Sequence, residues 1–318
     1  MTAAVECRNV SVAYGANKVL DSIDLTVNAG ETLALLGPSG SGKTTLLLAI
    51  AGFVPLQTGE IEIKGQVVSG PRHFVPPERR ALGMVFQNYA LWPHLDAADT
   101  VAYPMRRAGI EKREARRRAV ELLSDLELSD LATRKPSELS GGQQQRVGLA
   151  RALARQAAVF LFDEPTAHLD ATIRQAVTEE IARRRAEHGT AAIFSTHDAA
   201  EALAVSDRVA ILRSGRLVQI GTPRQVYEEP VDLWSARLTG PAALVGDDIV
   251  RPEWVLHGGD TAGTVTEVWY RGTHTDYTVK TEAGAIYVRL LGPPQLDVGA
   301  KQGWTISRSW HPHTRATG

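Results

Sequence analysis

The chain has 318 residues, of which 43% are hydrophobic and 22% charged, and its formal net charge is −1. This length favours two domains, and the balanced charge argues against a nucleic-acid binder, which usually has a basic domain or face. The single cysteine, Cys7, excludes an internal disulfide framework and fits a reducing cytosol. We expect Cys7 to be a packed strand residue, because no metal-binding or catalytic partner lies near it in the sequence.

No segment of the sequence approaches the roughly 18 consecutive apolar residues of a membrane span. Residues 1–8 also lack the basic and then apolar pattern of a signal peptide. We therefore expect the chain to stay in the compartment where it is made and to serve any membrane process as a peripheral partner.

The first part of the chain has the pattern of β-strands. Hydrophobic and polar residues alternate there, which is typical of half-buried strands. The alternating hydrophobic residues are Val5, Val10, Val12, Tyr14, Val19, Ile23, Leu25, Val27, Ile61 and Ile63. Residues 32–36 are a continuous apolar run, which predicts a strand buried on both faces, and a helix is expected from about Lys43 to Ala51.

A glycine-rich segment, Gly37-Pro-Ser-Gly-Ser-Gly-Lys-Thr44, connects this strand and helix and fits the P-loop pattern. Backbone N–H groups at such a helix start surround a nucleotide's phosphates. Lys43 is expected to contact the β- and γ-phosphates of ATP, and Thr44 to place its hydroxyl on Mg²⁺. The predicted nucleotide-binding residues are those of this segment and the residue that follows it: Gly37, Pro38, Ser39, Gly40, Ser41, Gly42, Lys43, Thr44 and Thr45. A P-loop alone leaves kinases, GTPases and motor ATPases open.

Residues 111–126 predict an amphipathic helix, whose arginines alternate with glutamates and so favour a solvated face over a nucleic-acid contact. The segment Leu139-Ser-Gly-Gly-Gln143, followed by a helix from about Gln144 to Leu153, predicts a second anion-binding helix start. A simple helix N-cap is the alternative. With one P-loop and two phosphate-facing segments, we expect two copies head to tail. ATP would lie between the P-loop of one copy and Ser140, Gly141, Gly142 and Gln143 of the other.

Two further apolar runs end in polar residues. Residues 157–162 lead to Asp163 and Glu164, and residues 191–194 lead to Ser195-Thr-His197. Apolar strands alternating with helices predict a largely parallel α/β sheet with ligand groups at the strands' carboxyl ends. Asp163 is expected to reach Mg²⁺, Glu164 to polarise an attacking water, and His197 to contact the γ-phosphate. The alternatives are ordinary surface carboxylates and a structural histidine.

After Gly240-Pro241 the sequence changes to short, threonine- and valine-rich runs, which predict a small β-barrel or sandwich. These runs lie in residues 263–269, 277–280 and 285–289. We place the boundary between the two domains near residues 238–244.

These motifs together resemble those of ATP-binding-cassette ATPases. Walker A lies at residues 37–44, the LSGGQ signature at 139–143, and Walker B ends at Asp163-Glu164. The resemblance implies a P-loop NTPase cassette over residues 4–238, with a helical signature subdomain at about 95–155. It also implies that Tyr14 stacks on adenine, that Gln87 contacts Mg²⁺ or the attacking water, and that Asp170 is the D-loop aspartate. His197 would be the switch histidine.

The sequence departs from the family pattern in two places. Residues 167–170 read Ala-His-Leu-Asp where Ser-Ala-Leu-Asp is common, so His168 either tunes communication between subunits or fills space. Asn88 and Trp92 follow Gln87 where aspartate and phenylalanine are usual. The apolar and aromatic residues after Gln87 still suit a groove that receives a helix of a membrane subunit, or they pack within the helical subdomain.

Residues 241–318, with Arg251-Pro-Glu253, resemble the OB-like TOBE domain of importer ATPases. The resemblance implies a Mg²⁺-dependent ATPase that forms a homodimer and drives two integral membrane permease subunits, with an extracytoplasmic solute-binding protein as an indirect partner. It would lie on the cytoplasmic face of the inner membrane. Residues 75–87 most resemble the ferric-ion and polyamine branches.

Three other functions fit these motifs less well. A soluble cassette that acts on DNA or ribosomes would carry a coiled coil, a zinc module or a second cassette, and the sequence has none of these. An exporter cassette usually lacks the β-rich tail. A P-loop kinase or GTPase does not explain the LSGGQ segment. No nucleic-acid partner is expected.

Overall fold

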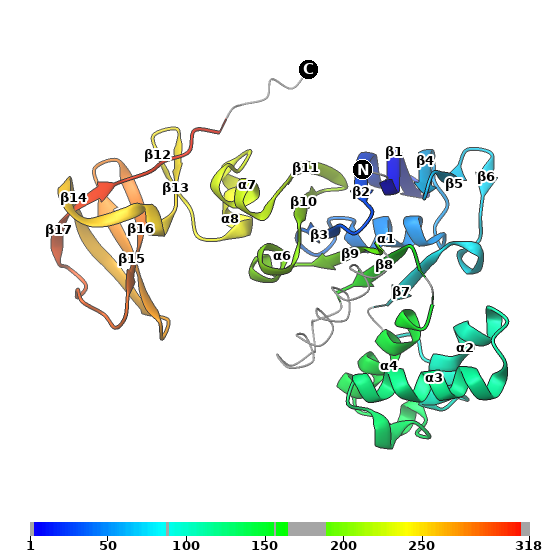
Figure 1. Ribbon diagram of the computed structural model, residues 1–318. Coiled ribbons are helices and arrows are strands. Elements are labelled where there is room, and N and C mark those ends of the chain that lie inside the picture. Colours follow the sequence, from blue (N-terminus) through cyan, green and yellow to red (C-terminus); the bar gives the residue numbers. More distant parts are fainter. Residues whose placement is uncertain (1–2, 87–88, 156, 165–188, 313–318) are drawn as a thin grey trace. The chain divides into compact units, whose positions relative to one another are not determined.

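A computed structural model describes residues 3–86, 89–155, 157–164 and 189–312 of the chain. The chain divides into two units, residues 1–218 and 219–318, and one strand, residues 216–221, crosses the division (Figure 1). The mixture of strands and helices in the first unit confirms the predicted α/β class, and the second unit is mainly β. None of the helices in the described part of the chain has the length and apolarity needed to cross a bilayer.

An antiparallel sheet in the first unit has the strand order β2-β1-β4-β5-β6. Its strands are β1 (Ala3–Tyr14), β2 (Asn17–Asn28), β4 (Thr58–Ile63), β5 (Gln66–Gly70) and β6 (His73–Phe74). The alternating residues Val5, Val10 and Val12 point into the core, as predicted. Cys7 is also buried in β1, which confirms its expected place and raises the pKa of its thiol to about 12.

A second sheet has the order β11-β10-β3-β9-β8-β7. The predicted site residues Asp163, Glu164 and His197 lie at or just after the carboxyl ends of its strands. The neighbours from β10 to β7 are parallel. Its strands are β3 (Thr32–Leu36), β7 (Leu82–Val85), β8 (Val159–Asp163), β9 (Ala191–Thr196), β10 (Arg208–Arg213) and β11 (Arg216–Gly221). Every residue of β8 and β9 is buried, as their apolar runs predict for a parallel sheet.

The helices of the first unit are α1 (Lys43–Ala51), α2 (Ala97–Arg107), α3 (Lys112–Asp125), α4 (Gly141–Leu153) and α6 (Ala199–Val205). Single 3₁₀ turns lie at Pro77–Arg79, Ser129–Leu131 and Pro136–Glu138. Helix α1 has the predicted bounds. Helices α2, α3 and α4 pack against one another as a group within the first unit (Figure 1). Helix α4 begins at Gly141, earlier than the predicted Gln144, because the side chain of Ser140 caps it.

The second unit has two short helices, α7 (Pro223–Glu228) and α8 (Leu233–Thr239), before its strands. The strands are β12 (Ala243–Val245), β13 (Asp248–Val250), β14 (Val255–Tyr270), β15 (His274–Thr281), β16 (Gly284–Leu291) and β17 (Lys301–Ile306), with a 3₁₀ turn at Pro252–Trp254. The main sheet has the order β16-β15-β14-β17 and is antiparallel. The fully buried Trp304 belongs to its core.

The structure divides the chain between Val218 and Gln219, ahead of the sequence boundary near residues 238–244. The reason lies in Arg251, which is 0% exposed. Its guanidinium donates hydrogen bonds to the carbonyls of Ala236 (2.7 Å) and Gly240 (3.1 Å) at the end of α8 and to the carbonyl of Tyr227 (2.7 Å) in α7. These bonds attach α7 and α8 to the β-domain, although both helices precede the change in sequence character.

Candidate functional site

The loop between β3 and α1 can be built only with glycine at some positions. Gly40 and Gly42 have φ values of 79° and 106°, in the left-handed region that favours glycine. A Cβ on Gly42 would also lie 2.8 Å from Cδ2 of Leu20, and one on Gly37 would lie 2.5 Å from the carbonyl oxygen of Leu212. The loop therefore presents its backbone closely, as an anion cradle at the start of α1 requires.

Lys43, the first residue of α1, folds back over this loop. Its ammonium donates hydrogen bonds to the carbonyls of Gly37 (2.8 Å) and Pro38 (3.1 Å), and the residue is only 5% exposed. Burial lowers the pKa of Lys43, while the nearby charges of Glu164 and Asp163 act to raise it. The Lys43 ammonium is held by two backbone carbonyls at the phosphate loop, where it can bind a phosphate group.

Asp163 gathers hydrogen bonds from two other elements at the carboxyl end of β8. Its Oδ1 accepts a hydrogen bond from the hydroxyl of Thr44 at 2.9 Å and from the hydroxyl of Ser195 at 2.8 Å. Thr44 comes from α1, and Ser195 lies opposite Asp163 in the parallel pair of β8 and β9. The expected meeting of polar groups at this sheet edge is therefore present in the structure.

Glu164 follows Asp163 with a φ of 48°, an uncommon value for a residue with a side chain. Its backbone N–H donates to the hydroxyl of Ser195 at 3.0 Å. Nδ1 of His197 lies 3.7 Å from Oε1 of Glu164, and the His197 side chain is 62% exposed. The predicted base and the predicted phosphate-contacting histidine are thus neighbours, with the histidine open to solvent.

Thr44 and Asp163 bring together two hard oxygen donors, which are the ligands that Mg²⁺ prefers. They also lie beside Lys43, where a nucleotide's phosphates would be bound. The residues that are present therefore fit a magnesium ion. The third predicted ligand, Gln87, lies outside the described residues, as do Asn88, Ala167, His168 and Asp170.

The signature segment forms a capping box at the start of α4. The Ser140 N–H donates to Oε1 of Gln143 at 2.8 Å, and the Gln143 N–H lies 3.4 Å from the Ser140 hydroxyl. Residues 140–143 therefore form the helix N-cap that the sequence left open as an alternative. A Cβ on Gly141 or Gly142 would meet no atom within 4 Å, so the backbone here is open to the approach of another group.

Arg151 joins the signature helix to the segment that follows Gln87. From the far end of α4 it donates hydrogen bonds to the carbonyls of Ala90 (2.5 Å) and Tyr89 (3.0 Å), and it lies 5.2 Å from the ring centre of Trp92. Tyr89 and Ala90 both have positive φ values. Burial lowers the pKa of Arg151 to about 10, which leaves it charged at neutral pH. Trp92 therefore packs within the helical group in this conformation.

Tyr14 lies at the end of β1, beside a turn at Gly15, and is 53% exposed. Among the described residues, neither Tyr14 nor the signature residues form a hydrogen bond with the cluster of Lys43, Thr44 and Asp163. The structure thus brings together the P-loop, Asp163, Glu164 and His197. It also adds Ser195, for which the sequence predicts only a place at the end of a strand.

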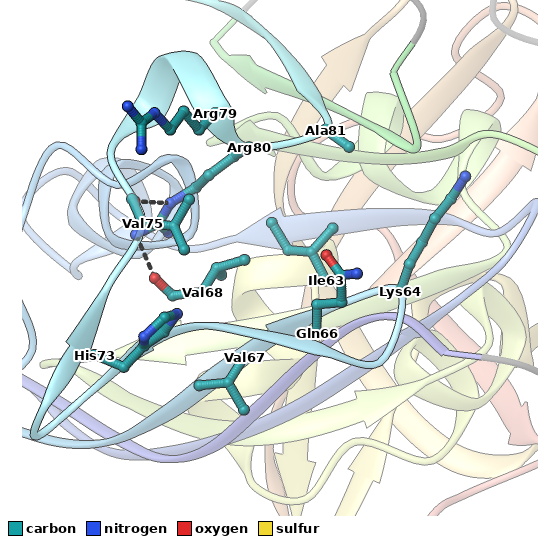
Figure 2. A pocket seen from close by; sticks show the side chains of 10 residues that line it. All are labelled: Ile63, Lys64, Gln66, Val67, Val68, His73, Val75, Arg79, Arg80 and Ala81. Atoms are coloured by element: carbon teal, nitrogen blue, oxygen red, sulfur yellow. Dashed lines mark hydrogen bonds between the residues drawn. The ribbon is translucent and has the colours of Figure 1, made fainter.

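A cavity of about 570 Å³ lies away from the phosphate loop, between β4, β5 and the turn at Pro77–Arg79 (Figure 2). Arg80 lines it beside Val68 and Val75, whose carbonyls accept its hydrogen bonds at 3.0 and 2.7 Å. Its guanidinium also donates to the carbonyl of Ile50 (2.7 Å) near the end of α1. Arg80 therefore attaches the far end of the phosphate-binding helix to the antiparallel sheet.

Comparison with known proteins gives two family matches in this chain. Residues 20–167 match the ABC transporter family, and residues 249–314 match the TOBE domain. The spermidine/putrescine import ATP-binding protein of Thermobifida fusca is 39% identical, over 97% of this chain and 92% of that protein. The Fe(3+) ions import ATP-binding protein of Rhizobium meliloti is 38% identical, over 90% of each chain.

The fold also resembles a solved structure of another protein, with a TM-score of 0.64 and 32% identity. That structure shows a dimeric post-hydrolysis state of an ATP-binding cassette bound to ADP and Pi. The match covers 69% of this chain and 99% of that one. These findings confirm the predicted cassette fold followed by a TOBE domain.

Proposed function

Because the chain belongs to the ABC transporter family, we propose that it is the ATP-hydrolysing subunit of a binding-protein-dependent importer. The chain is an ABC-type ATPase with a C-terminal TOBE domain. The observation that supports ATP hydrolysis by this chain is the cluster in which Thr44 and Ser195 both donate to Asp163 beside Glu164. A ferric ion or a polyamine is the favoured solute, in line with the import proteins that the chain resembles.

In the proposed reaction, water attacks the γ-phosphorus of ATP, and the bond from this phosphorus to the β,γ-bridging oxygen breaks to release ADP and phosphate. Glu164 would polarise the water and take up its proton. Lys43 and His197 would stabilise negative charge on the γ-phosphoryl oxygens. Thr44, Gln87 and Asp163 would hold Mg²⁺, which when bound supplies positive charge to the β- and γ-phosphates.

The remaining site residues have binding roles in this proposal. Tyr14 is exposed and would stack on the adenine. Two copies would bind ATP head to tail, so that Ser140, Gly141, Gly142 and Gln143 of one copy face the P-loop of the other. The open backbone at Gly141 and Gly142 supports such an approach. Asp170 would be the D-loop aspartate and contribute to nucleotide binding.

The proposed membrane partners are two permease subunits, each of which inserts a helix into a groove on the first unit. Exposed aromatic side chains that pack against Phe86 and Trp92 support this docking. Phe53, which is exposed, packs edge-on against Phe86 with ring centres 5.4 Å apart. Trp92 packs against the exposed Tyr103 at 4.7 Å. The chain would thus lie on the cytoplasmic face of the inner membrane as a peripheral subunit.

Affinity purification of the full chain from gently solubilised native membranes tests this function. We expect a multi-span permease to be recovered with it, together with a solute-binding protein whose bound ligand identifies the solute. Recovery of ribosomes or DNA-associated proteins, with no membrane protein, would overturn the importer function.

A further inference from the structure

We propose that Ser195 is a positioning residue for ATP hydrolysis, which fixes Asp163 and Glu164 through one hydroxyl group. The inference rests on the proposed role of Glu164 as the base. Ser195 is 0% exposed and lies on β9, next to the end of β8 that carries both carboxylates. It therefore acts through other residues and does not touch the substrate.

The hydroxyl of Ser195 uses both of its hydrogen-bonding functions at this point. Its single O–H donates to Oδ1 of Asp163 at 2.8 Å, and its oxygen accepts the N–H of Glu164 at 3.0 Å. An apolar side chain at the same place in β9 could make neither bond. The hydroxyl thus links two consecutive residues of one strand end from the neighbouring strand.

The bond to Glu164 determines how the chain leaves β8. Glu164 has a φ of 48°, a conformation that is disfavoured for glutamate and persists where its surroundings enforce it. The N–H bond to Ser195 is one such restraint, and it sets the direction from which the carboxylate meets Nδ1 of His197 at 3.7 Å. A change at Ser195 would therefore misplace the carboxylate of Glu164.

Asp163 and Glu164 differ in how much each depends on its hydrogen bond with Ser195. Asp163 keeps a second donor, the hydroxyl of Thr44 at 2.9 Å, if Ser195 is lost. The backbone N–H of Glu164 would lose its contact with β9. We therefore expect a variant without this hydroxyl to keep its affinity for magnesium nucleotide and to lose turnover, which separates kcat from KM.

The test compares Ser195→Ala with wild type and with Thr190→Val, a matched control. Thr190 is also buried and precedes the opposite end of β9, where its hydroxyl donates to the carbonyl of Ala157 at 3.4 Å. We expect Ser195→Ala to lower kcat by about 10- to 100-fold, with KM for ATP within about threefold of wild type. Thr190→Val should keep the wild-type kcat.

Two readouts besides activity complete the test. Ser195→Ala in a Glu164→Gln background should keep the affinity for labelled magnesium-ATP, measured by equilibrium binding, and should lower kcat no further, because the two residues act as a unit. Thermal unfolding of Ser195→Ala should match that of Thr190→Val within a few degrees.

A wild-type kcat in Ser195→Ala would overturn the inference, as would a joint loss of kcat, nucleotide affinity and thermal stability. If Glu164→Gln alone loses turnover while Ser195→Ala does not, only the positioning role fails. Near-normal hydrolysis by Glu164→Gln would instead overturn the base in the proposed function.

Discussion

The hydroxyl of Thr44 donates a hydrogen bond to Oδ1 of Asp163 at 2.9 Å, across 119 positions of sequence. This bond joins the start of α1 to the end of β8. The phosphate-binding helix and the strand that carries the carboxylates are therefore in contact. The same bond places the two proposed oxygen ligands of Mg²⁺ side by side.

The first prediction concerns the charge of Asp163. Asp163→Asn keeps an oxygen that can accept the hydrogen bond of Thr44 but removes the negative charge that attracts Mg²⁺. We expect the rate of ATP hydrolysis at fixed Mg²⁺ to fall by about 100-fold or more. A magnesium titration of ATPase activity checks this, with the exposed Asp130→Asn as the matched control. An unchanged rate and magnesium dependence in Asp163→Asn would contradict the assignment.

The second prediction compares two glycines of the P-loop. A Cβ on Gly40 would meet no atom within 4 Å, so Gly40→Ala carries only the strain of a φ of 79°, about 1 kcal/mol. A Cβ on Gly42 would meet Leu20 at 2.8 Å and the carbonyl of Val19 at 3.2 Å. We expect Gly42→Ala to be less stable than Gly40→Ala by about 1 to 3 kcal/mol. Urea unfolding measures the difference, and equal stabilities would contradict the packing described here.

Local patterns in the sequence predict several elements of this fold. The apolar run at residues 32–36 and the glycine loop after it predict β3 and the bounds of α1, since a buried parallel strand and a P-loop each have a distinctive pattern. The positions of Asp163 and Glu164 could also be predicted from the sequence, because carboxylates after an apolar strand mark the edge of a parallel sheet. His197 follows from the same reasoning about the next strand.

Other features depend on contacts that leave no pattern in the sequence. Arg251 binds backbone carbonyls of α7 and α8, which any residue can supply, so the division at Val218 and Gln219 could not be foreseen. Ser195 had one signal, a polar residue at the end of an apolar strand. Its role depends on the register between β8 and β9, which only the structure supplies.

The third prediction concerns Arg251 in the second unit. Arg251→Met removes the guanidinium bonds to the carbonyls of Tyr227 and Ala236, of which Ala236 keeps the hydroxyl of Thr239 as a donor at 2.9 Å. The loss should reduce the stability of this unit by about 3 kcal/mol or more. The partly exposed Arg308, which pairs with Glu228 at 3.0 Å, is the control, and Arg308→Met should cost less than about 1 kcal/mol. Calorimetry compares the two variants. Equal effects would show that Arg251 does not hold α7 and α8.

The fourth prediction concerns Arg151 in the signature helix. Lysine cannot reproduce the paired hydrogen bonds to Tyr89 and Ala90, so Arg151→Lys should release the strained segment after Gln87. We expect amide hydrogen exchange in peptides spanning residues 89–95 to speed up by about tenfold. The exposed Arg118→Lys on α3 is the control and should leave this exchange unchanged. Unaltered exchange in Arg151→Lys would mean that other contacts hold the segment.

The fifth prediction tests the central claim, that ATP joins two copies of this chain and that hydrolysis separates them. Glu164→Gln should bind ATP but lose most of its turnover, because the amide cannot take up a proton from water. Sedimentation of this variant is the most direct measurement. We predict a dimer with ATP and Mg²⁺, and a monomer with ADP or without nucleotide. A species that stays monomeric with ATP, or a dimer that is indifferent to nucleotide, would contradict the account.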